Sequence, residues 1–299
     1  MSSNARNAWL PVACLGIGAS LWGIIWYPVR LLEAQGLVGI WLTLALYAAA
    51  LIASLPRTLA ALPEFARRPG QLALLMVAAG WTNIAFFEAV LAGNILRVLL
   101  LFYLSPLWAT LMGWIILRER ISRMALASLL LAMAGALLML WDERIGWPWP
   151  RDVADWYAIS SGFAFALSNV IVRKLQDVSI AGKAVAVWSG VVLLCVLLIP
   201  AMHPGVPTAP AGAVMGAAAL GIFGIMLMTV LVQYGVTHMP VHRSAVIALV
   251  ELVAGAVSQQ LLTDEIVRPI EWGGGVLIAL GAYLAARAAA SDSGRPTVP

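Results

Sequence analysis

The sequence has few charged residues and almost no cysteine. Charged residues make up 11% of the 299 residues, whereas apolar residues make up 62% and the mean hydropathy is +0.93. A soluble domain has about 25% charged residues, so this composition excludes a soluble enzyme and predicts a polytopic membrane protein. The two cysteines, Cys14 and Cys195, lie far apart inside apolar runs and lack the spacing of metal ligands. They exclude a secreted disulfide scaffold, and we expect both to be buried packing thiols.

Motifs for nucleic acids, nucleotides and metals are also missing. The net charge is +4, but the basic residues sit in short loops between apolar runs, and no RNA-binding or zinc signature accompanies them. We therefore expect no nucleic-acid partner. The triplet Gly273-Gly274-Gly275 is not a phosphate loop, because no Lys-Ser/Thr follows it, and we assign it to helix packing. The sequence predicts no cofactor and no metal.

Ten apolar runs have about the length of a membrane-spanning helix. Helices are the default for such runs, because unpaired backbone amides are not tolerated in hydrocarbon. The predicted spans cover residues 9–31, 37–55, 71–91, 95–117, 124–141, 156–172, 184–199, 213–236, 244–262 and 270–286. The expected fold is an all-α integral membrane protein with ten transmembrane helices.

The basic residues are divided unevenly between the two ends of these spans. Of the 18 Lys and Arg residues, 13 fall on the side of the N-terminus, and the remaining five are Arg30, Arg97, Arg144, Arg151 and Arg268. Cytoplasmic loops are enriched in Lys and Arg, so both termini are expected in the cytoplasm, in agreement with an even number of spans. The Arg- and Ala-rich composition is typical of a bacterial protein, and we expect the cytoplasmic (inner) membrane.

The two halves of the chain carry similar patterns. A shift of 146 residues places Ser105 on Glu251, Glu119 on Glu265 and Gly135 on Gly281. Each half has five predicted helices, and because five is odd, the halves must lie upside down relative to each other. We predict two inverted five-helix repeats, residues 1–146 and 147–289, followed by a cytoplasmic tail over residues 290–299.

These features resemble the drug/metabolite transporter superfamily, and in particular its EamA-like ten-helix carriers. The resemblance rests on Ser105-Pro106 ahead of Glu119, on Glu251 ahead of Glu265, and on Ser20-Leu21-Trp22-Gly23, which is similar to the small-Trp-Gly signature of the family. It implies a carrier of small organic metabolites. Within the family, the chain looks most like the bacterial aromatic amino-acid exporters.

The second half departs from the family pattern at two places. Ala164-Phe165-Ala166-Leu167-Ser168-Asn169 stands where the signature would recur, and Leu252 follows Glu251 where the family has proline. These departures weaken the transfer of family features to the second half.

Polar side chains inside membrane spans are candidate site residues, because burying them in hydrocarbon is costly. Glu251 lies about seven residues into its predicted span, where it is either a proton or substrate-amine site or a structural carboxyl group. Asn83 and Asn169 offer donors and acceptors to both ends of an amino acid, and interhelical hydrogen bonding explains them as well. Aromatic residues in the same helices either stack on an aromatic substrate or simply pack. The candidate substrate-binding residues are Trp22, Asn83, Phe87, Tyr103, Trp108, Asn169, Tyr234, Ser244 and Glu251.

Two further charged sites lie at predicted helix ends. Glu88 and Arg97 flank the turn at Ala92-Gly93-Asn94, which predicts an ion pair that pins this hairpin, or else a gate contact or a carboxylate-binding Arg97. Glu119 stands where the fourth span meets a tight turn, and we assign it to the structure of that turn.

The leading hypothesis is a secondary transporter that exports small organic metabolites, with amino acids and especially aromatic ones favoured, by alternating access and without enzymatic activity. Without a nucleotide-binding motif, transport must use a gradient or run downhill, and protons are available for coupling if Glu251 or Glu88 titrates. The expected partners are the small-molecule substrate and the lipid bilayer. The alternatives are an exporter or facilitator of other metabolites or drugs, a channel, and an intramembrane enzyme. The sequence shows neither the charge rings of a channel nor paired acid–base groups inside a helix.

Overall fold

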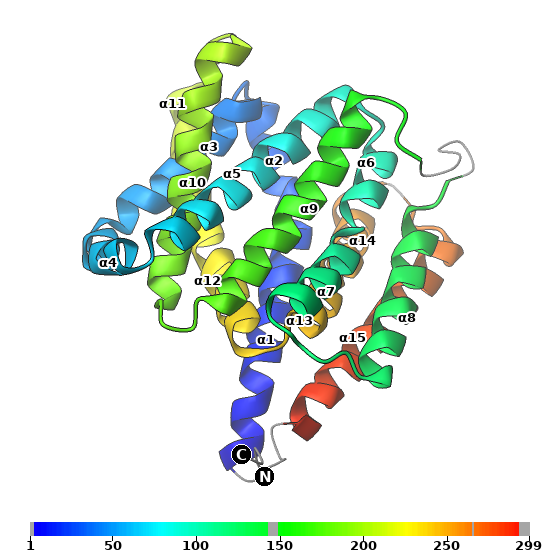
Figure 1. The fold of residues 1–299 in the computed structure, drawn as a ribbon. Coiled ribbons are helices and arrows are strands. Elements are labelled where there is room, and N and C mark those ends of the chain that lie inside the picture. The colour runs from blue at the N-terminus through cyan, green and yellow to red at the C-terminus, as the bar shows by residue number, and fades with distance from the viewer. Residues whose placement is uncertain (1–2, 143–148, 265, 293–299) are drawn as a thin grey trace.

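The fold is a bundle of helices in a computed structural model that describes residues 3–142, 149–264 and 266–292 (Figure 1), and no strand occurs in these ranges. In chain order the elements are α1 (Ser3–Ile24), α2 (Trp26–Glu33), α3 (Gly39–Ala53), α4 (Leu55–Arg67), α5 (Pro69–Ala92), α6 (Ile95–Phe102), α7 (Ser105–Ile116), α8 (Arg123–Leu140), α9 (Val153–Lys174), α10 (Ile180–Met202), α11 (Ala211–Ala219), the π-helical turn η2 (Leu220–Ile225), α12 (Met226–His238), α13 (Val241–Ala248), α14 (Val250–Leu262) and α15 (Pro269–Asp292). Arg144, Glu265 and residues 293–299 of the expected tail lie outside the described residues.

The ten predicted spans coincide with helical stretches to within one or two residues at their ends, but the count of ten is not confirmed. By length and composition, eight helical stretches of the described chain could cross a membrane, or nine if α3 and α4 are taken together. These two helices meet at 85°, and the sequence analysis did not foresee α4 as a helix. The predicted span over residues 156–172 corresponds to α9, which is not among the nine although its 22 residues would extend about 33 Å at 1.5 Å per residue.

Several helices cross at glycine, where a side chain would not fit. A Cβ atom on Gly135 of α8 would lie 2.5 Å from the carbonyl oxygen of Gly274 on α15, and the converse distance is also 2.5 Å. Gly281 faces Ser128 and Ala132 of α8 in the same way, so the packing role expected for the glycines of the last span is confirmed for these two.

Three of the helical stretches are broken: α1–α2 at Ile25, α6–α7 at Tyr103 and Leu104, and α13–α14 at Leu249. The second break has a clear cause, because Pro106 has no N–H to donate to the carbonyl of Phe102. The third break occurs without proline. These breaks set the position of the candidate site.

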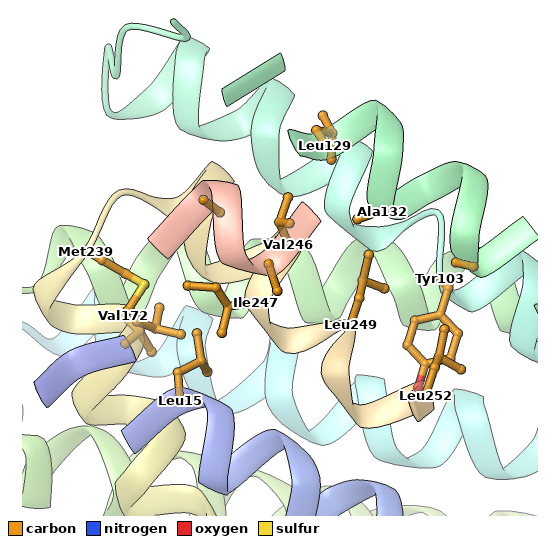
Figure 2. Packing of buried hydrophobic residues seen from close by; sticks show 14 of the residues in the cluster. Leu15, Tyr103, Leu129, Ala132, Val172, Met239, Val246, Ile247, Leu249 and Leu252 are labelled. Atoms are coloured by element: carbon orange, nitrogen blue, oxygen red, sulfur yellow. The ribbon is translucent and has the colours of Figure 1, made fainter. Parts of the chain in front are cut away.

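The two halves of the chain share one hydrophobic core. Leu15 of α1 and Tyr103 belong to the same buried cluster as Val172, Val246 and Leu249 of the second half (Figure 2). The helix contacts between the halves are reciprocal, because α1 packs against α12, α13 and α14 while α9 packs against α5, α6 and α7. The helices α8 and α15 pack against each other. We call the end of the bundle at which α1 begins and α15 ends the terminal end (Figure 1).

Candidate functional site

A small cavity lies between the two helix breaks of α6–α7 and α13–α14. Its volume of about 20 Å³ is enough for roughly one or two water molecules. It is lined by Phe102, Tyr103, Ser105, Pro106, Ala109, Phe165, Asn169, Ala245, Ala248, Leu249 and Glu251. Three of the predicted substrate-binding residues, Tyr103, Asn169 and Glu251, therefore meet at one cavity, which draws on both halves of the chain.

Glu251 is the charged residue of this cavity. It stands in the first turn of α14, where a carboxylate is favoured by the positive end of the helix dipole. Its carboxyl group and the hydroxyl-bearing side chain of Tyr103 line the same cavity. Tyr103 is 7% exposed, and its ring lies against Leu252 (Figure 2). The break after α6 thus positions a hydroxyl donor opposite the acid of α14.

Aromatic rings form one wall of the cavity. Phe102 contacts Tyr103 with ring centroids 5.2 Å apart and Phe165 of α9 with centroids 5.6 Å apart. Gly162 makes this approach possible, because a Cβ atom there would lie 2.5 Å from the Phe102 carbonyl oxygen. The sequence analysis did not select Phe165, because nothing in its apolar run distinguishes the face that points inward.

Three other predicted residues belong to a second region, between α3 and α5. Asn83 accepts a 3.0 Å hydrogen bond from the hydroxyl of Tyr47 and donates one to Ala79 O, so interhelical and local bonding occupies it. Phe87 and Glu88 line a separate cavity of about 10 Å³ with residues of α3. The structure does not bring this group into the cavity of Glu251.

The remaining predicted residues also lie apart from the cavity. Trp22 packs against the buried cluster that contains residues of α3 and α10. Trp108 stacks edge-on with Phe163 at 5.8 Å, Tyr234 stacks on His238 at 4.2 Å, and the Ser244 hydroxyl donates to Val241 O. Packing explains these positions.

The ion pair of Arg97 differs from the prediction. Arg97 Nε lies 2.7 and 2.8 Å from the two carboxylate oxygens of Asp155 in α9, and the two side chains are 8% and 2% exposed. Asp155 also accepts from the Arg151 amide at 2.8 Å. The predicted pairing with Glu88 was wrong, because the first turn of α9, distant in sequence, packs against α6. Arg97 therefore joins the halves at the end of the bundle opposite the terminal end.

A polar network at the terminal end escaped the sequence analysis. Glu119 accepts a 2.8 Å hydrogen bond from the Val241 amide at the start of α13 and lies 3.4 Å from both Arg173 Nε and His242 Nδ1. It thus connects the end of the first-half helix α7 to helix ends of the second half, beyond the local turn role assigned to it. Arg173 donates in turn to Thr237 O.

Lys183 completes this terminal network. Its ammonium group donates to the Thr237 hydroxyl at 2.9 Å, and the side chain is 0% exposed. The sequence analysis counted Lys183 among loop cations, because α10 was expected to begin at residue 184, whereas it begins at Ile180. A network of five residues thus links helix ends of the two halves at the terminal end: Glu119, Arg173, Lys183, Thr237 and His242.

The comparisons with known proteins place this geometry in context. Residues 153–287 match the family model described as the EamA-like transporter family. No curated protein matches the chain. Several solved structures match the chain, and one of these crystal structures has a TM-score of 0.75 over 93% of this chain and 97% of the other, at 18% sequence identity. The structural likeness shows a shared fold, and the family match in the second half suggests a membrane transporter of small molecules.

Proposed function

We propose that this chain is a secondary transporter of small organic molecules that works by alternating access. The EamA-like match over residues 153–287 supports transport. The observation that supports a binding site is the cavity between two helix breaks that correspond to each other in the repeat. The shift of 146 residues places Tyr103 on Leu249 and Ser105 on Glu251. Transporters built from inverted repeats bind substrate where discontinuous helices of the two repeats meet.

Further symmetry supports the inverted-repeat architecture. The helices α6 and α13 each have eight residues with arginine at the third position, Arg97 and Arg243, and both arginines are buried. They are followed by α7 and α14, which have 12 and 13 residues. Together with the reciprocal contacts between the halves, this pattern favours ten spans, with α3 and α9 each crossing the membrane.

The finer proposal is export of amino acids, aromatic ones favoured, across a bacterial cytoplasmic membrane with both termini in the cytoplasm. Glu251 and Asn169 can bind the ammonium group, and Phe102 and Phe165 offer aromatic surface. The cavity is too small for a whole amino acid, so the helices on its two sides must separate when substrate enters. Opening of the terminal network and of the Arg97–Asp155 end in turn would give alternating access.

Counterflow in proteoliposomes tests this function. Vesicles that contain the purified protein and unlabelled phenylalanine, tryptophan or threonine receive the same amino acid as label outside. A carrier accumulates the label transiently and saturably. A channel would merely equilibrate it. Absence of exchange in vesicles that contain folded protein would indicate that the substrate is another metabolite or a drug and not one of these amino acids.

Glu251→Gln tests the role of this residue in coupling. The substitution removes the titratable group of the cavity, so we expect the transport rate to lose its dependence on pH between 5 and 8. Glu88→Gln tests the other carboxyl group considered for proton coupling, because Glu88 is also half-buried but lines the other cavity. A wild-type pH profile in Glu251→Gln would remove Glu251 from proton coupling.

A further inference from the structure

We propose that the cavity at the helix breaks is a head-group site for organic primary ammonium ions, which binds the amine of its ligand and does not require a carboxylate. The inference rests on the transport function proposed above and names the chemistry that its central site selects. Aromatic and aliphatic amines that lack a carboxyl group would accordingly be ligands.

The charges around the cavity support selection of a cation. Among its lining residues Glu251 is the acid, and none is Lys, Arg or His. Basic side chains elsewhere in the bundle already have partners, because Arg97 pairs with Asp155 and Lys183 donates to Thr237. A ligand ammonium would compensate the carboxylate of Glu251, whereas a ligand carboxylate would find no opposite charge among the residues that line the cavity.

The wall of the cavity fits the same class of ligand. Phe102, Tyr103 and Phe165 form a contiguous set of rings, with neighbouring centroids 5.2 and 5.6 Å apart. Aromatic rings attract ammonium groups through their negative faces, more strongly where water is excluded. Asn169 and Ser105 add oxygen acceptors for the N–H groups. Carboxylate, rings and acceptors together form a cage for an ammonium group.

The size of the cavity limits what it can recognise. A volume of about 20 Å³ matches an ammonium head, which is close to a water molecule in size, and cannot hold an aromatic ring. The rest of the ligand must therefore lie outside this cavity. Affinity at this site then depends on the amine, and the carboxyl group of an amino acid contributes little or is unfavourable.

Equilibrium dialysis on the full-length protein in detergent tests the ranking. The probes are phenethylamine, phenylalanine and 3-phenylpropionate, which share the ring and differ in their charged groups. We expect phenethylamine to bind at least as tightly as phenylalanine, and 3-phenylpropionate to bind at least about tenfold more weakly, because its charge is unpaired in the site. Equal binding of the amine and the carboxylate, or no binding of the amine, would overturn the inference.

Three variants assign the binding to this cavity. Glu251→Gln is expected to weaken the binding of phenethylamine at least about tenfold. The affinity of the control Glu88→Gln should stay within about twofold of the wild type. Tyr103→Phe keeps the ring and removes one hydroxyl, so folding is preserved and the affinity should change less than in Glu251→Gln. An unchanged affinity in Glu251→Gln would place the amine elsewhere and contradict the proposal.

Transport measurements separate this inference from the proposed function. If amines bind through Glu251 but neither labelled phenethylamine nor labelled phenylalanine shows counterflow, the carrier proposal fails and the site stands. If phenylalanine shows saturable counterflow that phenethylamine does not inhibit, the carrier stands and the ammonium site is refuted.

Discussion

At the scale of single residues, burial distinguishes two Arg–Asp pairs that have the same chemistry. Arg97 and Asp155 are 8% and 2% exposed, whereas Arg68 and Asp177, also joined by a 2.8 Å bond, are 48% and 51% exposed. Breaking a buried pair leaves one charge without its partner and without water, whereas water solvates the remaining charge when an exposed pair is broken. The two pairs therefore give a matched test of where charge stabilises this bundle.

Asp155→Asn is expected to lower the free energy of unfolding by about 3–5 kcal/mol, because it leaves the buried guanidinium of Arg97 uncompensated. Asp177→Asn should leave the unfolding midpoint close to that of the wild type. Thermal unfolding in detergent measures both midpoints. Equal midpoints in the two variants would show that Arg97 finds another anionic partner.

The exposed pair also has a defined pH dependence. Arg68 holds the pKa of Asp177 below its ordinary value, which is about 3.9. A lowered carboxyl pKa stabilises the fold above that ordinary value, and this contribution disappears as the pH falls through the lowered pKa. Between pH 5 and 8 the pair therefore contributes a constant amount, and pH effects on transport in this range must arise elsewhere.

The site residues could be predicted from sequence only as members of membrane spans. Tyr103, Asn169 and Glu251 were expected and do meet at one cavity, whereas Trp108 was expected and does not. The spans are apolar all round, so no periodicity marks the face that points inward. Lys183 was missed for a related reason, since a lysine at a helix end follows the pattern of an ordinary loop cation.

At the scale of helices, the positions of the spans were predictable and their breaks were not. The run over residues 95–117 is predominantly apolar, and hydropathy does not register the loss of the bond to Phe102 O that Pro106 causes. The break at Leu249 has no proline, so no residue type in the sequence marks it. The glycines that face these breaks carry the relevant sequence signal: Gly162 lies against Phe102 O and Gly23 against Glu251 O.

Gly162→Ala tests the contact at the first break. The added Cβ would lie 2.5 Å from the Phe102 carbonyl oxygen, so α9 must move away from α6. We expect a loss of about 1–3 kcal/mol in stability and a slower counterflow. Gly273→Ala is the control, because a Cβ there meets no atom within 4 Å. Equal transport rates in both variants would mean that this contact has no part in the site.

At the scale of the whole molecule, the chain forms one bundle whose helix ends are linked by polar contacts at the terminal end. Glu119, Arg173, Thr237 and Lys183 link helix ends from both halves there. The sequence predicted an excess of positive charge at this end but could not show that part of it is buried. Whether a basic residue at this end is buried depends on contacts between helices that are distant in the chain, and a single sequence does not reveal these contacts.

Thr237→Val tests whether this network closes the terminal end. The change removes the hydroxyl that accepts from the fully buried ammonium of Lys183. Loss of a hydrogen bond to a charged group is worth about 1.5–3 kcal/mol, so the open population should rise about tenfold or more.

The readout is alkylation of a cysteine placed at Ser244, which is 2% exposed, in a protein whose Cys14 and Cys195 are replaced. Thr58→Val, which removes a hydroxyl on α4, serves as the control. If both variants show the wild-type labelling rate, the terminal network is structural and does not gate access.

The modest hydropathy of α9 has a consequence for biosynthesis. If α9 crosses the membrane, we expect it to enter beside helices that already pack against it, and its most extensive contacts are with α5, α6 and α7. All three precede it in the chain, so they are already made when the ribosome reaches residue 153. The order of the helices along the chain thus supplies α9 with its neighbours, and a second half synthesised without the first would lack them.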